Sequence, residues 1–383
     1  MKRKLFYALV LIVATIFIYG CLDEEKIITA DMRGGKISEQ AEKIDIPAKI
    51  DPIEKQLNSM TLDEKIGQMV MIGVHGTEIN NDIRFLLNEF HFGGVIFFDR
   101  NMENIEQIKK LASDIEKVAN QKAPMLFALD EEGGTIVRGK EFLQAAPSQE
   151  EIGNSGNPEN ATYWATFNAN LLHSIGVNIN FAPVADVGSH DTRSFSYDVQ
   201  TVTKFVEAAA RGYEEKNFLY CLKHFPGIGR SKMDPHQEVS SIDVDKDTLY
   251  AEDLPPFKKI ISEHDNSHFM IMVGHLKYDA IDSMNSASLS PAVMTDLLRD
   301  EMGFSGVVIT DDLEMGAIKN NVDLSTLGIR MIQAGGDIAL VCHDYASQQI
   351  VYNSIFNAVK CGEISEERIN ESVRRILKLK SNL

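Results

Sequence analysis

The stretch FLYCLKHF, residues 218–225, decides the fold because it joins an apolar run to ionisable side chains. The run FLYCL is typical of a strand that is covered on both faces of a parallel sheet. Lys223 and His224 stand at its end, and a Pro-Gly turn follows directly. Parallel α/β proteins place their chemistry at the carboxyl ends of strands, so this stretch predicts a parallel strand with a functional end.

Seven other β-rich apolar runs alternate along the chain with longer helical patterns, as expected of βα units around a parallel sheet. The expected helices cover residues 104–121, 161–175, 203–216 and 290–303. The last of them opens with Ser290 as N-cap and Pro291 at the first helical position. The expected strands cover residues 67–74, 93–98, 125–130, 177–184, 218–225, 269–276, 306–312 and 337–342.

Eight strands, each followed by a helix, favour an α/β fold of the closed (β/α)8 TIM-barrel type over a doubly wound sheet. An open dinucleotide-binding sheet would carry a G-x-G-x-x-G turn after the first strand, and VHGTEINN at residues 74–81 does not supply one. We therefore expect one barrel domain over residues 53–383.

The N-terminal segment predicts export and attachment to a membrane. Residues 1–20 have a basic start and a long apolar stretch, which is typical of a secretory signal peptide. The sequence IYGC that follows resembles a lipobox, with Cys21 as the lipidated residue, and an uncleaved membrane anchor is the alternative. Residues 21–52 are charged and poor in aromatic residues, so we expect an acidic flexible linker between the cell-envelope membrane and the barrel.

The net charge and the cysteines exclude several classes of protein. The formal charge is −18, and removal of residues 1–20 takes away three positive charges, which leaves about −21. Such a charge repels nucleic acid, so no nucleic-acid partner is expected. Cys221, Cys342 and Cys361 are widely spaced and fit neither a disulfide framework nor a metal pair, so we interpret them as packing residues.

Ionisable residues gather at the carboxyl ends of the expected strands, where a barrel enzyme has its active site. Metal-dependent and serine hydrolases are disfavoured, because the chain has no H-x-H, H-E-x-x-H or G-x-S-x-G motif. Glycoside hydrolysis needs a carboxylate nucleophile, an acid/base and groups that bind sugar hydroxyls, which this set can supply. The residues at these strand ends are Arg100, Asn101, Asp130, Glu131, Asp186, Lys223, His224, His275, Asp311, Asp312 and His343.

Asp311 and Asp312 are neighbours on one strand, so their side chains point to opposite faces and only one can enter the site. The alternation alone does not choose between them. His275 fits a rim residue or a structural hydrogen bond equally well, and His343 is interpreted as structural.

Six motifs occur in one order between residues 55 and 380: GGVIFFDRN, DEEGGTIVR, FAPVADV followed by RSF, KHFPGIGRSKMDPH, MVGHLKYDA and VVITDDLEMGAI. In this order they resemble glycoside hydrolase family 3, and in particular its single-domain β-N-acetylglucosaminidase branch. The resemblance implies a TIM barrel that uses neither a metal nor an organic cofactor. It also implies release of terminal β-N-acetylglucosamine from an oligosaccharide partner, such as a peptidoglycan fragment or a chitooligosaccharide.

The resemblance assigns the catalytic roles to three residues. Asp311, the first acid of the T-D-D stretch, is then the nucleophile, and Asp312 is its outward structural neighbour. His236 is the acid/base, which suits an imidazole that titrates near neutrality, and Asp234 orients it. Substrate contacts are assigned to Asp130, Arg138, Arg193, Lys223 and His224.

The chain departs from the family pattern at Ile228, Arg230, Pro235 and Thr135, where the family has His, Asp, Ser and Arg. These departures leave a non-catalytic saccharide-binding lipoprotein, a β-glucosidase and a β-glycoside phosphorylase as alternatives. A further alternative is substrate-assisted hydrolysis, in which Glu131 of an Asp-Glu pair would be the acid.

Overall fold

The computed structural model describes residues 51–188, 191–231, 241–319 and 322–383. The predicted signal peptide, the lipidation site Cys21 and almost all of the predicted linker lie outside the described residues, and so do Asp234, Pro235 and His236. Within the described ranges, no helix is both long and apolar enough to span a lipid bilayer.

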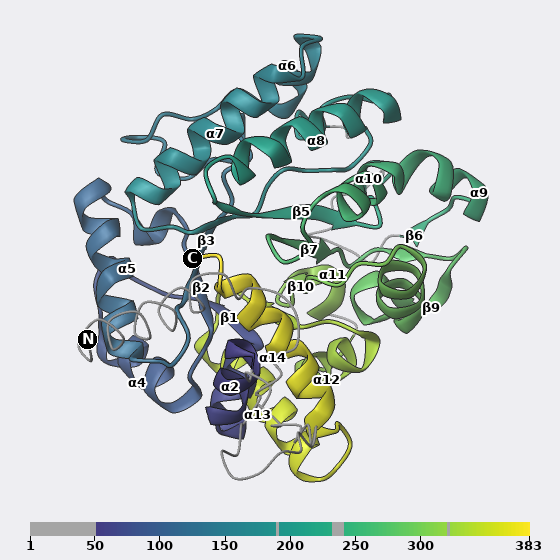
Figure 1. Ribbon diagram of the computed structural model, residues 1–383. Helices are drawn as coiled ribbons and strands as arrows, with labels where there is room; N and C mark the ends of the chain where they lie inside the picture. The colour runs from purple at the N-terminus through teal and green to yellow at the C-terminus, as the bar shows by residue number, and fades with distance from the viewer. Residues whose placement is uncertain (1–50, 189–190, 232–240, 320–321) are drawn as a thin grey trace, which may run out of the picture. The chain divides into compact units, whose positions relative to one another are not determined.

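Eight parallel strands close into a barrel in the order β1-β11-β10-β7-β5-β4-β3-β2, which confirms the predicted (β/α)8 fold (Figure 1). Each expected apolar run contains one of these strands, shorter than the run because only the hydrogen-bonded part of the run is a strand. The barrel strands are β1 (Val70–Gly73), β2 (Gly94–Ile96), β3 (Leu126–Leu129), β4 (Ile179–Asn180), β5 (Leu219–Phe225), β7 (Phe269–Val273), β10 (Val307–Asp312) and β11 (Ile338–Val341).

Helices surround the barrel on its outside (Figure 1). In α5, for example, Ile108, Leu111 and Ile115 form a buried face, and Asn104 caps the first turn by accepting from the backbone N of Gln107. The α-helices are α2 (Pro52–Ser59), α3 (Leu62–Gln68), α4 (Asn81–Phe90), α5 (Ile105–Ala119), α6 (Gln149–Asn154), α7 (Glu159–Ser174), α8 (Val199–Glu214), α9 (Lys246–Thr248), α10 (Pro255–Glu263), α11 (Gly316–Lys319), α12 (Leu324–Ala334), α13 (Tyr345–Lys360) and α14 (Glu366–Lys380).

Four short or irregular helices complete the pattern, and one of them corresponds to the expected helix over residues 290–303. The hydroxyl of Ser290 accepts from the backbone N of Val293 at 3.2 Å, as the predicted N-cap requires. The wider turn of this helix, with i to i+5 hydrogen bonds, was not predicted. The four are η1 (Asp99–Asn101), η2 (Leu249–Asp253), η3 (Ala287–Leu289) and η4 (Ala292–Glu301).

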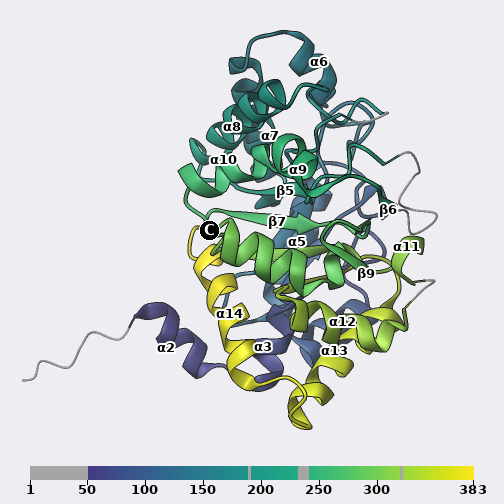
Figure 2. The same ribbon diagram turned by 90° about the vertical axis from the view of Figure 1, so that its right-hand side faces the viewer.

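A small sheet of three strands, in the order β6-β8-β9, stands apart from the barrel. It consists of β6 (Ser241–Ile242), β8 (Lys277–Tyr278) and β9 (Asp282–Ser286). Figure 2 shows β6, β9 and α11 together at one end of the barrel. The hydroxyl of Tyr278 donates to the backbone O of Gly227 at 2.7 Å, so this sheet supports the turn that follows β5.

The cysteines were predicted as packing residues, and this holds for two of them. Cys221 and Cys342 are buried in the barrel wall, as predicted. The prediction is wrong for Cys361, which is exposed because it follows the last residue of α13, where the helix ends at the surface.

A buried carboxylate joins the amino ends of the strands to the outer helices. Asp337 precedes β11, and its fully buried carboxylate accepts from Arg299 on η4 at 2.6 Å and from Arg375 on α14 at 3.0 Å. It also accepts from the hydroxyl of Ser372 at 2.6 Å and from the backbone N of Val308 at 2.9 Å. Burial alone would raise the pKa of Asp337, but the surrounding arginines lower it.

We expect Asp337→Asn to lower the free energy of unfolding by about 3–5 kcal/mol, because it leaves partly buried guanidinium groups without their counter-charge at a fully buried position. Urea unfolding near pH 7 measures the loss. Because the pKa of Asp337 is lowered in the folded state, the gap between wild type and variant should shrink as the pH falls through the acid range. Glu54→Gln is the control, since Glu54 pairs with the partly exposed Arg374, and it should cost less than about 1 kcal/mol. Equal losses in the two variants would contradict this role.

Candidate active site

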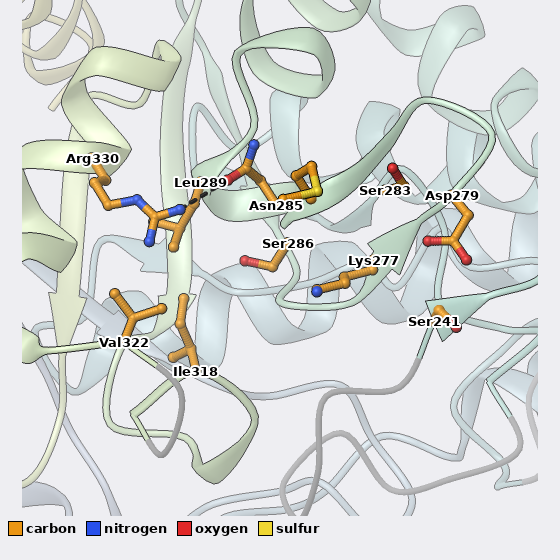
Figure 3. A pocket seen from close by; sticks show the side chains of 11 residues that line it. Ser241, Lys277, Asp279, Ser283, Asn285, Ser286, Leu289, Ile318, Val322 and Arg330 are labelled. Atoms are coloured by element: carbon orange, nitrogen blue, oxygen red, sulfur yellow. Dashed lines mark hydrogen bonds between the residues drawn. The ribbon is translucent and has the colours of Figure 1, made fainter.

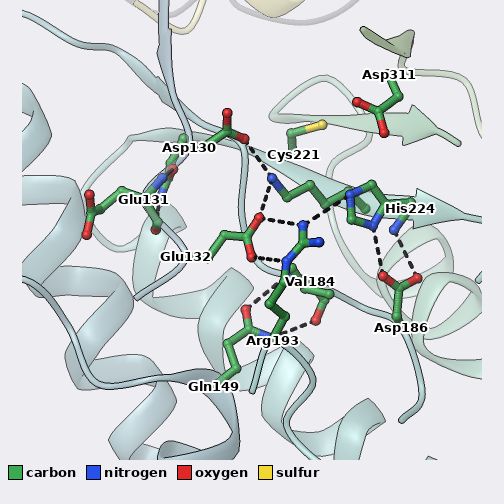
Figure 4. Close-up of polar contacts among 12 residues, drawn as sticks. Asp130, Glu131, Glu132, Gln149, Val184, Asp186, Arg193, Cys221, His224 and Asp311 are labelled. Atoms are coloured by element: carbon green, nitrogen blue, oxygen red, sulfur yellow. Dashed lines mark hydrogen bonds and ion pairs between the residues drawn. The ribbon is translucent and has the colours of Figure 1, made fainter. Parts of the chain in front are cut away.

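Charged side chains from β5 and from the loops after β3 and β4 meet at the carboxyl end of the barrel (Figure 4). Lys223 on β5 donates to Asp130 Oδ1 at 2.7 Å and lies 2.7 Å from Glu132 Oε1. Arg193 donates to the two oxygens of Glu132, from Nε at 2.7 Å and from Nη2 at 2.9 Å. The structure therefore brings together three of the predicted substrate-binding residues, through a carboxylate that the sequence analysis did not select.

Glu132 is the centre of this network. Burial alone would raise its pKa, but Lys223 and Arg193 lower it to about 2, so the carboxylate stays charged at neutral pH. It then balances the buried Lys223 and the half-buried Arg193 at once, and these two cations would otherwise be costly to hold in the barrel. The sequence signal for Glu132 was its place after β3, two residues beyond Asp130, but its partners Lys223 and Arg193 are distant in the sequence.

His224 is oriented by a second carboxylate, Asp186, which follows β4. Asp186 Oδ2 lies 2.8 Å from His224 Nδ1, and Oδ1 accepts from the backbone N of His224 at 3.1 Å. The opposite nitrogen, Nε2, lies 3.4 Å from Arg193 Nη2 and belongs to the same charged group. Asp186 was noted at the rim from the sequence, but its role in holding the imidazole was not predicted.

The two acids of β10 take separate environments. Asp311 is half-buried, and its pKa is lowered because His224, His275 and Lys223 outweigh the effect of burial. Figure 4 shows its carboxylate on the same side of the charged group as His224. It is therefore a charged carboxylate at the carboxyl end of β10.

Asp312 is engaged by the neighbouring strand. Its Oδ1 accepts from the backbone N of Cys342 at 3.2 Å, and its Oδ2 lies 3.2 Å from His343 Nε2. His275 is also fully engaged, because Nδ1 lies 2.7 Å from the hydroxyl of Ser288 and Nε2 lies 2.9 Å from the backbone O of Asp312. Of the two interpretations given to His275, the structural hydrogen bond describes its contacts.

Arg138 reaches the rim through a tight loop after β3. Its Nη2 lies 3.6 Å from Asp130 Oδ2, which places the predicted substrate contacts Arg138 and Asp130 side by side. The loop turns at Gly133 and Gly134, which both have positive φ, as expected of turn formers. A Cβ on Gly133 would lie 2.2 Å from the backbone O of Pro147, so no larger residue fits there.

Two of the departures from the family pattern have local partners. Arg230 donates to Asp253 Oδ2 at 2.8 Å and pairs with Glu252, so it fastens the start of the loop after β5 to η2. The backbone N of Ile228 donates to Asp186 Oδ1 at 2.9 Å, while its side chain packs against the core. Thr135 is exposed.

A barrel whose strand ends present a charged carboxylate together with Lys223, Arg193 and His224 has the layout of a sugar-processing hydrolase of the TIM-barrel class. Residues 61–379 match the glycosyl hydrolase family 3 N-terminal domain, and the chain belongs to this family.

Relatives of known name support the branch as well as the family. The chain is 30% identical over 324 residues to a β-hexosaminidase of Nitrosomonas eutropha, which covers 81% of this chain and 91% of that protein. It is 32% identical over 338 residues to β-hexosaminidase A of Pseudoalteromonas piscicida, which covers 80% of this chain and 56% of that protein.

A solved structure agrees with these relatives. The family 3 β-N-acetylglucosaminidase of Paenibacillus sp. str. FPU-7 superposes with a TM-score of 0.81 at 33% identity, covering 85% of this chain and 63% of that one. The chain thus spans nearly the whole Nitrosomonas relative and between half and two thirds of the Pseudoalteromonas and Paenibacillus proteins.

Glu131 lies between Asp130 and Glu132 in the sequence, but the environment of its side chain differs from that of the charged group around Glu132. It is buried, its Oε2 accepts from the backbone N of Arg138 at 2.9 Å, and its Oε1 has no hydrogen-bond partner within the described part of the chain. Burial raises its pKa to about 7. Glu131 is therefore a carboxyl group that exchanges its proton close to neutral pH.

Glu131→Gln should become more stable relative to wild type as the pH rises from about 5 to about 8, by up to about 3 kcal/mol. The reason is that the raised pKa of Glu131 favours the folded, protonated form below its unfolded value, and this contribution is lost as the pH passes about 7. Urea unfolding of both proteins at the two pH values measures the difference. The exposed Glu141→Gln should show no such trend, and parallel pH profiles for wild type and Glu131→Gln would contradict the assignment.

Proposed function

We propose that the protein is a retaining glycoside hydrolase that releases non-reducing terminal β-N-acetylglucosamine from peptidoglycan fragments or chitooligosaccharides. The observation that carries the proposal is the Asp311 carboxylate at the end of β10, on the side of His224 (Figure 4), where His224, His275 and Lys223 favour its charged form. Retaining hydrolysis needs such a group as nucleophile.

In the first step, an oxygen of Asp311 bonds to the anomeric carbon while the bond from that carbon to the leaving oxygen breaks. The low pKa of Asp311 keeps it ionised and ready to attack. His236 donates a proton to the leaving oxygen. In the second step His236 removes a proton from water, which attacks the anomeric carbon and frees Asp311.

The sugar itself would be held by the charged group around Asp130. Lys223 fixes Asp130 by its bond to Oδ1, so the carboxylate is oriented to accept from sugar hydroxyls. Arg138 beside Asp130, together with Arg193 and His224 beyond Glu132, supplies donors for other hydroxyls. Such groups gain most when they are fixed before the substrate arrives, and the contacts among them provide that fixation.

The acid/base role of His236 and the orienting role of Asp234 stay predictions, since both residues lie outside the described part. Their support is the match of their spacing to the family pattern and the chemistry of an imidazole held by a carboxylate. The preference for an N-acetylated sugar is supported by the names of the relatives. Attachment to the cell envelope through Cys21 is likewise proposed from the sequence of the N-terminal segment.

The substrate-assisted alternative would use Glu131 as its acid. The carboxyl of Glu131 bonds to the backbone of Arg138 and lines a small cavity with Trp164, Asn168 and Tyr213. Figure 4 shows Glu131 and Asp311 at opposite sides of the charged group. This placement favours Asp311 as the residue that faces the reacting sugar.

Asp311→Asn should lower kcat/KM on an aryl β-N-acetylglucosaminide by about 10³-fold or more, since an amide cannot form the glycosyl intermediate. Wild type should cleave this substrate in preference to the matching aryl β-glucoside. The full chain is assayed in detergent, with the exposed Asp300→Asn as control. Wild-type turnover by Asp311→Asn would refute the mechanism, and a folded wild type inactive on both glycosides would favour a saccharide-binding protein.

Glu131→Gln separates the two mechanisms in the same assay. If Asp311 is the nucleophile, this variant should keep its activity within about tenfold of wild type, because only the support of the Arg138 loop is altered. A loss as large as that of Asp311→Asn would transfer the acid role to Glu131.

A further inference from the structure

The orientation of the proposed nucleophile depends on its neighbour Asp312. The backbone N of Asp312 donates to Asp311 Oδ1 at 2.8 Å, and this is the hydrogen bond that the Asp311 carboxylate accepts among the described residues. One carboxylate oxygen is therefore held by the peptide of Asp312, and the other is left to attack the anomeric carbon. A shift of Asp312 would turn the Asp311 carboxylate, so the groups that fix Asp312 also fix the direction of attack.

Asp312 is held by hydrogen bonds on several sides. Its Oδ1 accepts from the backbone N of Cys342 at 3.2 Å and from that of Glu314 at 3.1 Å, and its backbone O lies 2.9 Å from His275 Nε2. The segment after β10 also borders a polar pocket of about 520 Å³, through Ile318 of α11 (Figure 3). None of the described contacts of Asp312 comes from a residue that lines this pocket. The carboxylate of Asp312 thus takes its position from its own chain and from the end of β11.

The second oxygen of Asp312 is held by His343, which comes two residues after β11. Asp312 Oδ2 lies 3.2 Å from His343 Nε2, and the opposite ring nitrogen, Nδ1, lies 3.3 Å from Arg100 Nη1. A guanidinium group can only donate, so in the neutral ring Nδ1 accepts from Arg100 and Nε2 carries the hydrogen that is donated to Asp312. The imidazole therefore joins a cation to a carboxylate through one acceptor and one donor.

His343 and Arg100 are themselves fixed by backbone contacts. The backbone N of His343 donates to Glu314 Oε2, and Arg100 Nη2 donates to the backbone O of Cys342 at 2.6 Å. The bond to Asp312 raises the pKa of His343, although burial and Arg100 oppose this rise. The protonated ring keeps its Nε2 hydrogen, so the contact with Asp312 holds in both charge states. His343 can thus transmit the position of β11 to Asp312.

We infer that His343 is a positioning residue for the proposed reaction: it holds the Asp312 carboxylate so that the backbone N of Asp312 directs Asp311 toward the anomeric carbon. The inference rests on the proposed hydrolase function and adds to it a residue that acts through Asp312 instead of binding the sugar. A purely structural role would change sugar binding and stability together with the rate. A positioning role changes the step in which Asp311 attacks and leaves sugar binding as it is.

The test separates the attack by Asp311 from the binding of the sugar. With enzyme in excess over an aryl β-N-acetylglucosaminide, the single-turnover release of the aryl group measures the attack, and the inhibition constant of free N-acetylglucosamine measures binding. The full chain in detergent is compared as wild type, His343→Ala, His343→Gln, Asp312→Asn and the double variant of His343→Ala with Asp312→Asn. His173→Ala, which replaces an exposed histidine on α7, is the matched control. The His343 side chain is 53% exposed, so its replacement should leave the fold intact, and thermal unfolding checks this for each variant.

His343→Ala should slow the single-turnover release by about tenfold and leave the inhibition constant within about twofold of wild type, as His173→Ala should for both quantities. His343→Gln should keep the rate within about threefold of wild type, because its amide can donate to Asp312 and accept from Arg100 without an imidazole ring. In Asp312→Asn the amide nitrogen cannot accept from His343, so adding His343→Ala to this variant should slow the release no further.

Three results would overturn the inference and leave the proposed function intact. They are a wild-type rate in His343→Ala, equal changes in its rate and its inhibition constant, and additive effects of His343→Ala and Asp312→Asn. A His343→Gln variant as slow as His343→Ala would also overturn it, since the effect would then belong to the ring and not to the bond. Failure of the folded wild type to release the aryl group overturns both the inference and the proposed function.

Discussion

The site depends on one buried charge, the carboxylate of Glu132. It joins Lys223 on β5 to Arg193 in the loop after β4, and Lys223 in turn holds Asp130 after β3. Without Glu132, Lys223 and Arg193 would lie close together without the carboxylate that they share, and Arg193 would lose both of its bonds to that carboxylate. Charge neutralisation at this one residue therefore allows three consecutive parts of the barrel to present sugar-binding groups in a common geometry.

The two ends of the barrel use buried ion groups for different purposes. At the amino ends, Asp337 satisfies its oxygens with arginines, a serine and a backbone amide, so no bonding capacity is left for a ligand. At the carboxyl ends, Asp311 accepts one hydrogen bond among the described residues, from the backbone N of Asp312, and the charges of His224, His275 and Lys223 stabilise its ionised form. A carboxylate that is stabilised by surrounding charge and accepts few hydrogen bonds is suited to react. A carboxylate whose oxygens already accept a full set of hydrogen bonds is suited to hold helices to strands.

The sequence predicted the barrel because its signal is local: eight apolar runs alternate with helical periods, and each run contains a strand. It also predicted that Asp311 and Asp312 would differ, because side chains alternate along a strand. The contacts of Asp312 with Cys342 and His343 could not be predicted in this way. They depend on the pairing of β10 with β11, and the local sequence pattern does not show which strands pair. The role of Glu132 was missed for the same reason, since its partners lie about 60 and 90 residues away and ion pairs carry no periodicity.

At Ile228 and Arg230 the side chains differ from the family pattern, yet both residues have contacts that hold the start of the loop after β5. Asp186 binds the backbone N of residue 228, and a backbone donor is present whichever side chain stands there. Arg230 introduces a cation, and the partly exposed Glu252 and buried Asp253 of η2 supply its counter-charge. Burial raises the pKa of Asp253 to about 6 even beside Arg230, so this carboxylate would be less stable without the arginine. The ion pair between Arg230 and Asp253 of η2 thus holds the start of the loop in place, although its sequence differs from the family pattern.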